Sequence, residues 1–251
     1  MLEMLESPQC WVDVFKIIVI DLLLSGDNAV VIALASRSLP PSQQKKAILF
    51  GSFGAVILRI ILTFFAAYLL TLPYLKLAGG ALLVWIGVSL LKPDDDEEHI
   101  DAHSNLRAAI KTIIIADFVM SLDNVIGVAA AAKGNFALLV IGLGISIPLI
   151  IYGSTLMLKL MERFPIIVTA GGGLLGWVAG EMAITDPAVA QWVDANAHWM
   201  HNVLPAAGFV LVIVVGKWLV QRALAASEAK AAGQEEVLET SEAKAGVARS
   251  A

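Results

Sequence analysis

Charged residues are scarce in this 251-residue chain, in which Asp, Glu, Lys and Arg together make up only 16%. Hydrophobic residues make up 58%, and the mean hydropathy is +0.80. Soluble domains usually have about a quarter charged and roughly half apolar residues. The composition therefore excludes an ordinary soluble domain and predicts an all-α membrane protein that crosses the bilayer several times.

The chain also has little of what several other protein classes need. Its single cysteine, Cys10, excludes an internal disulfide and a cysteine-ligated metal cluster. The sequence contains no Lys/Arg-rich patch typical of nucleic-acid binding and no G-x-x-x-x-G-K-[ST] motif for a nucleotide. Its first residues are acidic, whereas a secretory signal needs a basic region, so we expect the first apolar segment to remain as a helix.

Seven apolar segments are candidates for membrane-spanning helices, which need about 20 residues each. They are residues 12–36, 47–71, 74–91, 107–132, 135–158, 165–184 and 203–224. Together they form one predicted transmembrane domain, residues 12–224. The polar tail, residues 225–251, is rich in Ala, Glu and Lys and is predicted to be disordered or a frayed helix.

Basic residues favour one orientation, because cytoplasmic loops carry an excess of Lys and Arg. With the N-terminus outside, the outer loops hold only Lys16, Lys76 and Lys133. The inner side then holds Arg37, Lys45, Lys46, Lys92, Arg107, Lys111, Lys159, Arg163, Lys217 and Arg222. We therefore predict an outside N-terminus and a cytoplasmic C-terminus, in the inner (plasma) membrane of a cell.

Two sequence motifs occur twice, in the same order. DLLLSGDNAVVIALA begins at Asp21 and DFVMSLDNVIGVAAA begins at Asp117, so the pattern Asp-x-x-x-Ser-x-Asp-Asn is duplicated. AGGALLVW (78–85) likewise returns as AGGGLLGW (170–177). Each copy holds three helices, so the second copy crosses the membrane in the opposite sense. The sequence predicts a 3+3 inverted-topology repeat, with copies at 12–91 and 107–184 and an extra helix at 203–224.

The duplicated motif places carboxylates where lipid or a dry helix interface is expected, at a cost of about 2.5–3.5 kcal/mol each on insertion scales. A helix break at Ser25-Gly26 would bring the first set together. Oxygen donors suit divalent cations such as Mg²⁺, Ca²⁺ or Mn²⁺. Alternatively, these polar groups only hold two helices together. The candidate metal ligands are Asp21, Asp27, Asn28, Asp117, Asp123 and Asn124, with Ser25 and Ser121 as additional candidates.

Other polar residues have two interpretations each. Glu181 is a candidate ligand or proton carrier, or else an interfacial glutamate. Arg59 is a candidate counter-charge or gate, or else a structural partner of one aspartate. The acidic segment 94–103 would collect cations or serve as a solvated linker. His198 and His201, three residues apart, would share a metal or belong to an interfacial amphipathic helix.

The motifs DLLLSGDNAVVIALA and DFVMSLDNVIGVAAA, with the duplicated AGG-x-LL-x-W, resemble those of the TerC family of integral membrane proteins, within the LysE-type exporter superfamily. The resemblance covers residues 12–224 and is closest to the short, riboswitch-linked branch regarded as manganese exporters. It implies that the acidic positions of the family correspond to Asp21, Asp27, Asp117 and Asp123. It also implies metal efflux, or metalation of exported enzymes, as the activity.

We therefore expect a secondary transporter, and not an enzyme, that exports Mn²⁺ as its substrate, with proton antiport as the simplest coupling and with no cofactor. Alternatives are a membrane partner of the secretion machinery that metalates exported proteins, or an exporter of Ca²⁺ or a basic amino acid. An aspartyl protease is disfavoured, because it needs one aspartate on each facing helix and not two with matching asparagines. The expected partners are the lipid bilayer and a divalent metal ion, with a homo-oligomer or a secretion-machinery partner as further options, and no nucleic acid.

Overall fold

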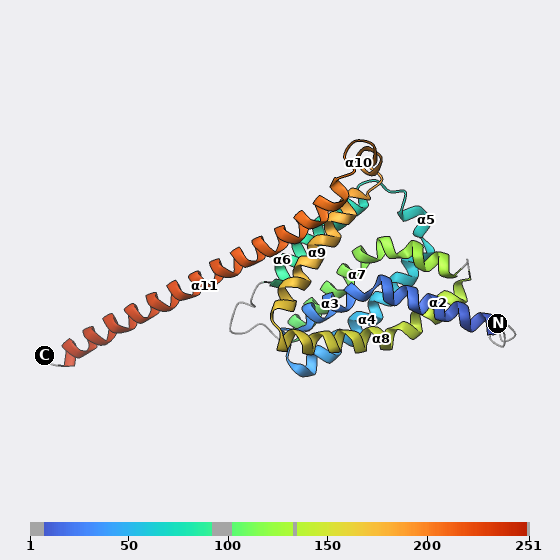
Figure 1. The fold of residues 1–251 in the computed structure, drawn as a ribbon. Helices are drawn as coiled ribbons and strands as arrows, with labels where there is room; N and C mark the ends of the chain where they lie inside the picture. Colours follow the sequence, from blue (N-terminus) through green and yellow to red (C-terminus); the bar gives the residue numbers. More distant parts are fainter. Residues whose placement is uncertain (1–7, 92–101, 133–134, 250–251) are drawn as a thin grey trace.

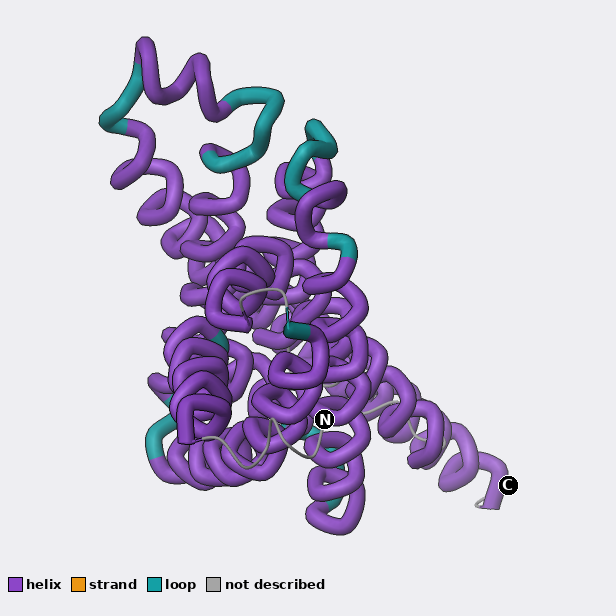
Figure 2. Tube along the Cα trace, turned by 90° about the vertical axis from the view of Figure 1, so that its right-hand side faces the viewer, coloured by secondary structure: helices purple, strands orange, loops and turns teal. Residues whose placement is uncertain are grey.

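The computed structural model describes residues 8–91, 102–132 and 135–249, and these ranges contain helices and no strand (Figure 1, Figure 2). Most of the acidic segment 94–103 lies outside the described residues. The helices are α2 (Pro8–Leu24), α3 (Gly26–Ser36), α4 (Pro41–Phe64), α5 (Ala66–Leu69), α6 (Leu75–Leu91), α7 (Ala102–Ala132), α8 (Phe136–Arg163), α9 (Ile166–Ile184), α10 (Ala190–Asn196) and α11 (Met200–Arg249).

The predicted all-helical membrane architecture is confirmed. In the described residues, five helices are long and apolar enough to cross a membrane, namely α4, α7, α8, α9 and the first half of α11. The bent pair α2–α3 makes a sixth candidate if it counts as one span. Helix α6 is apolar but has only 17 residues, which leaves it shorter than the other spans.

The first predicted helix, 12–36, is broken at the position expected from its sequence. Helix α2 ends at Leu24, α3 begins at Gly26, and the two differ in direction by 55°. Glycine weakens a helix interior by about 1 kcal/mol relative to alanine, and serine competes for backbone hydrogen bonds. The second copy of the motif has Leu122 in place of glycine, and there α7 continues without a break. The two copies therefore differ in backbone shape.

Helix packing follows a paired pattern in the described residues. Helix α4 packs on α7, while α8 packs on α2 and α3, and α6 packs on α9. Helix α11 lies along α9 and then continues far beyond the bundle to the C-terminal end (Figure 1). The α9–α11 contact depends on small residues, since a Cβ atom on Gly176 would overlap the Gly208 carbonyl.

The bundle exposes many large apolar side chains. Phe64, Tyr152 and Ile166 are 71%, 71% and 77% exposed, and other phenylalanines on α2 and α4 are exposed as well. Soluble monomers rarely leave so much contiguous apolar surface in water. The largely apolar core also contains the charged residues Asp21, Arg59 and Asp117, while many large apolar side chains are exposed on the outside of the bundle. That distribution is expected of helices surrounded by lipid.

Candidate cation site

A buried ion-pair cluster joins the two copies of the repeated motif. Arg59, on α4, is 1% exposed, and its guanidinium contacts the carboxylates of Asp21 on α2 and Asp117 on α7. The two aspartates are 0% and 4% exposed. Removal of one partner from such a buried group leaves an uncompensated charge, which costs about 3–5 kcal/mol. Arg59 therefore provides the positive charge that allows both carboxylates to be buried.

Two serines complete the cluster in equivalent ways. The Ser25 hydroxyl donates to Asp21 Oδ1 at 3.3 Å, and the Ser121 hydroxyl donates to Asp117 Oδ2 at 3.1 Å. Both serines also accept hydrogen bonds from Arg59, whose Nε lies 3.0 Å from Ser121 Oγ. Asp117 and Ser121, four residues apart, lie on one face of α7, whereas Ser25 directly follows the end of α2 that carries Asp21. Each copy of the motif thus offers the same pair of groups to one guanidinium.

The two asparagines reach across to the opposite copy of the motif. Asn28 Nδ2 donates to Asp117 Oδ1 at 2.6 Å. Asn124 Nδ2 donates to the Leu24 carbonyl at 2.7 Å. Leu24 is the last residue of α2, so its carbonyl lies at the helix break. The asparagines therefore satisfy different acceptors, and Asn124 stabilises the backbone at the break.

Two oxygen atoms of the cluster have no hydrogen-bond donor among the described residues. They are Asp21 Oδ2 and Asn28 Oδ1, and both are buried. Buried polar atoms nearly always have a hydrogen-bond partner, because a buried donor or acceptor without one costs about 1–3 kcal/mol. Both atoms are acceptors, so a water molecule that donates a hydrogen bond or a metal cation would satisfy them. The donor set consists of carboxylate, amide and hydroxyl oxygens, which fits a hard or borderline divalent cation.

The remaining predicted site residues lie outside these hydrogen bonds. Asp27 is half-buried at the start of α3, accepts from the Asn28 backbone N–H at 2.9 Å and lies within electrostatic range of Arg59 and Asp117. Asp123 forms an ion pair with Lys76 near the start of α6. Glu181 is exposed on α9.

The Trp177 Nε1 donates to Glu181 Oε1 at 2.8 Å, an interaction confined to one helix turn. The structure therefore brings Asp21, Ser25, Asn28, Asp117 and Ser121 together around Arg59. It places Asp123 and Glu181 with other partners.

Asp186 is a buried carboxylate that the sequence does not distinguish from an ordinary loop residue. It is 0% exposed and accepts from the backbone N–H groups of Ala188, Tyr74, Lys76 and Leu77 at 2.8, 2.9, 3.0 and 3.2 Å. Burial tends to raise the pKa of Asp186, but these four hydrogen bonds outweigh it and hold the pKa below its ordinary value. Such contacts between a side chain and distant backbone leave no sequence pattern.

A cavity lies between the helix break and α8. Ser25 and Gly26 line it on one side, with Ile150 and Gly153 among the residues on the other. Ser25 belongs both to the cavity wall and to the Arg59 cluster. The break therefore lies between the charged centre and the space beside α8 at Ser25.

Membrane-length helices around a buried charged centre define the class, a multi-pass integral membrane protein. Residues 6–227 match the sequence model of the integral membrane protein TerC family, and the chain belongs to that family. This confirms the resemblance carried by the duplicated motifs. Family membership is consistent with a membrane transporter.

Three bacterial relatives illustrate the similarity. The uncharacterized membrane protein YjbE of Bacillus subtilis is 45% identical over 81% of this chain and 93% of its own length. YceF of the same organism is 27% identical over 72% of this chain and 74% of its own length. The inner membrane protein YoaE of Escherichia coli is 25% identical over 66% of this chain and 36% of its own length. No solved structure matches the chain.

Proposed function

We propose that the chain is a secondary transporter that exports divalent metal cations, with Mn²⁺ as its preferred substrate, from the cytoplasm. One observation carries this proposal. The Arg59 guanidinium lies between two equivalent Asp–Ser pairs, one from each copy of the repeat. A positively charged group thus lies where a symmetric pair of carboxylates would hold a transported ion.

The donor set supports a divalent cation over the alternatives. Asp21 and Asp117 together carry two negative charges and Arg59 carries one positive charge, so the cluster attracts a further cation. The atoms Asp21 Oδ2 and Asn28 Oδ1 are free to coordinate it. The same arrangement disfavours an aspartyl protease, in which two carboxylates share one proton rather than one arginine. Asp27, within electrostatic range of Arg59, is the further ligand that we propose.

The packing pattern supports an inverted repeat. In the two copies, α2–α3 corresponds to α7, α4 to α8 and α6 to α9. If the copies are related by a two-fold axis, the contact of α4 with α7 is equivalent to the contact of α8 with α2 and α3, and both contacts are present. The α6–α9 contact would be converted into itself, and it is present too. At 1.5 Å per residue the 17 residues of α6 rise about 25 Å, which is near the lower limit for a span. We therefore propose that the chain crosses the inner (plasma) membrane seven times. Its N-terminus then lies outside and its C-terminus in the cytoplasm.

Export requires coupling to another gradient. A divalent ion that leaves against an inside-negative potential costs about 4.6 kcal/mol per 100 mV. We propose proton antiport through the carboxylates, in which Arg59 acts as a tethered cation. The guanidinium offsets one of the two aspartate charges when no metal is bound and withdraws when a metal enters. The cavity beside Ser25 and Gly26 leaves space at the helix break, next to one of the serines that the guanidinium contacts.

Cellular manganese content tests the proposal. We expect cells under manganese stress to contain less manganese when they express the wild type, and Asp21→Asn to abolish that difference. Asp13→Asn is the matched control, because Asp13 lies on the same helix about two turns away and pairs with Lys16. Equal manganese in cells with the wild type and cells with an empty vector would exclude manganese export. Retained export by Asp21→Asn would exclude this site.

A further inference from the structure

The end of α10, the turn after it and the start of α11 hold a second group of metal-ligating side chains, separate from the Arg59 cluster. We propose that Asp194, His198 and His201 form a site for a first-row transition-metal dication, with Zn²⁺ as its best probe. Among the described residues, these three offer ligand atoms that all lie within 4.8 Å of one another. This inference concerns binding at the protein surface and does not rest on the proposed transport function.

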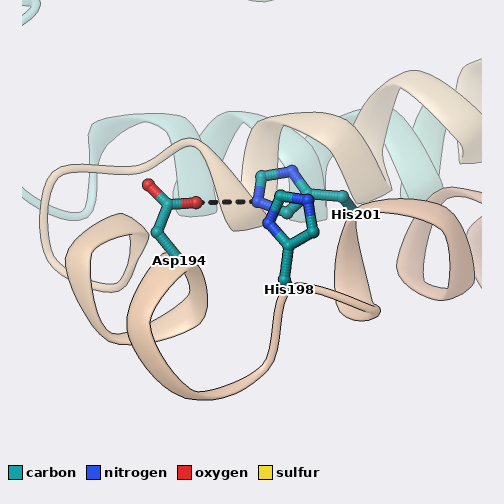
Figure 3. A group of neighbouring side chains, drawn as sticks. All are labelled: Asp194, His198 and His201. Atoms are coloured by element: carbon teal, nitrogen blue, oxygen red, sulfur yellow. Dashed lines mark hydrogen bonds and ion pairs between the residues drawn. The ribbon is translucent and has the colours of Figure 1, made fainter.

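The three side chains converge on one point (Figure 3). His201 Nε2 lies 2.8 Å from Asp194 Oδ1, and the centres of the two imidazole rings are 5.0 Å apart with their planes at 47°. Zinc–nitrogen bonds of about 2.0–2.1 Å would place neighbouring ligand atoms roughly 3.4 Å apart in a tetrahedral site. The His201–Asp194 pair would therefore have to open slightly, while ligand atoms as much as 4.8 Å apart would have to approach one another. Asp194 and His198 are exposed and His201 is half-buried, so side-chain rotation can supply both movements.

The local backbone holds the ligands in place. Val193 and Ala197 are buried at 2% and 5% exposure, and the Ala197 N–H donates to the Val193 carbonyl at 2.8 Å. The Met200 N–H then donates to the Ala197 carbonyl at 2.8 Å, so the turn follows α10 directly. These contacts fix Asp194 at the end of one helix and His201 at the start of the next. A bound ion would link α10 to α11.

The ligand types select the class of metal. Two imidazoles and one carboxylate suit Zn²⁺ and similar transition-metal ions, whereas Ca²⁺ and Mg²⁺ prefer oxygen ligands only. Three protein ligands leave at least one position for water, as in sites that exchange their ion or ligand. This donor set contrasts with the oxygen donors around Arg59. Trp192 and Trp199, 61% and 63% exposed, flank the turn and are suited to the membrane–water interface.

Calorimetry with Zn²⁺ on the full-length, tag-free protein in detergent tests the site. We expect the His198→Ala/His201→Ala double variant to bind this Zn²⁺ at least about tenfold more weakly. Mutation of a residue that only hydrogen-bonds to a metal ligand already lowers metal affinity by about 10–100-fold, so loss of two ligands should cost at least as much. Asn202→Ala changes an exposed neighbour in the same turn and should bind as the wild type does. Asp194→Asn keeps an oxygen next to His201 but removes the charge, so we expect it to bind more weakly without loss of fold.

Two further measurements separate this site from the intramembrane cluster. Asp21→Asn should leave the Zn²⁺ isotherm of this site unchanged even if it abolishes export. Excess Ca²⁺ should not displace the Zn²⁺, because imidazole is a poor calcium ligand. Wild-type Zn²⁺ affinity in both Asp194→Asn and the double histidine variant would overturn the proposal. Displacement by Ca²⁺, or loss of this binding in Asp21→Asn, would overturn it as well.

Discussion

Arg59 shows how much depends on one side chain in this bundle. The guanidinium contacts both side chains of each repeated Asp–Ser pair. Arginine suits this position because its planar donors are directed to several acceptors at once and it stays charged. In the proposed mechanism the same charge that stabilises the empty site competes with the incoming metal ion.

Replacement of Arg59 should therefore destabilise the metal-free protein and increase its response to metal. In Arg59→Gln we expect the free energy of unfolding to fall by about 3–5 kcal/mol, because Asp21 and Asp117 lose their counter-charge. Added Mn²⁺ should raise the Tm of the variant more than that of the wild type, because it replaces the missing charge. Thermal unfolding in detergent with and without Mn²⁺ measures both effects.

Arg37→Gln is the matched control for that experiment. Arg37 is an arginine near the end of a neighbouring helix and donates to the Leu90 carbonyl at 3.1 Å. It should show the wild-type Mn²⁺ response. If Arg59→Gln has the Tm of the wild type and no larger shift with Mn²⁺, Arg59 does not substitute for the ion.

At the scale of elements, the break between α2 and α3 distinguishes the two copies of the motif. A Cβ atom added to Gly26 would meet no described atom within 4 Å, so packing does not require glycine there. Alanine favours the helix by about 1 kcal/mol relative to glycine. Gly26→Ala should fold normally but favour a straighter α2–α3. That change would weaken the hydrogen bond from Asn28 Nδ2 to Asp117 Oδ1. We expect manganese export to fall several-fold.

Gly144→Ala provides the control for this change. Gly144 is a helical glycine in α8 whose added Cβ atom would also meet no described atom within 4 Å. It lies away from the break, so its substitution tests the effect of helix propensity alone. Export by both variants at the wild-type rate would show that flexibility at Gly26 is unnecessary. A loss in both would indicate a general effect of stiffening the helices.

Asp186 connects two elements that are far apart in sequence, the start of α6 and the segment after α9. Its pKa is lowered in the folded protein, so the stabilisation is fully present above the unfolded pKa of about 3.9 and is lost as the pH falls through the folded value. Asp186→Asn should lower the free energy of unfolding by about 1–3 kcal/mol at neutral pH. The difference in Tm between the variant and the wild type should be constant above about pH 5 and shrink below about pH 4. A difference that grows on acidification would contradict this assignment.

The helices were largely predictable, whereas several polar contacts were not. Apolar segments located α8 and α9 well, and the Ser25-Gly26 pair indicated the break. The i, i+4 spacing placed each serine beside its aspartate, because that relation is local. The Asp123–Lys76 ion pair and the hydrogen bonds of Asp186 depend on how distant helices dock. No local pattern encodes such docking, so the sequence offered several roles for these residues or none.

At the scale of the whole molecule, the accessibility of single cysteines tests whether α6 crosses the membrane. Cys10→Ser removes the only natural cysteine, so a new one can be labelled alone. Ser38, before α4, and Ala188, after α9, are both exposed positions suited to Ser38→Cys and Ala188→Cys. With seven spans and an outside N-terminus, Ala188→Cys reacts with an impermeant maleimide in intact cells and Ser38→Cys reacts only after permeabilisation. If α6 does not span, the chain enters α7 from outside. After the three crossings of α7, α8 and α9 it reaches the cytoplasmic side, so both positions are then protected in intact cells. That result would exclude the 3+3 inverted repeat, because the two copies would no longer cross the membrane in opposite senses.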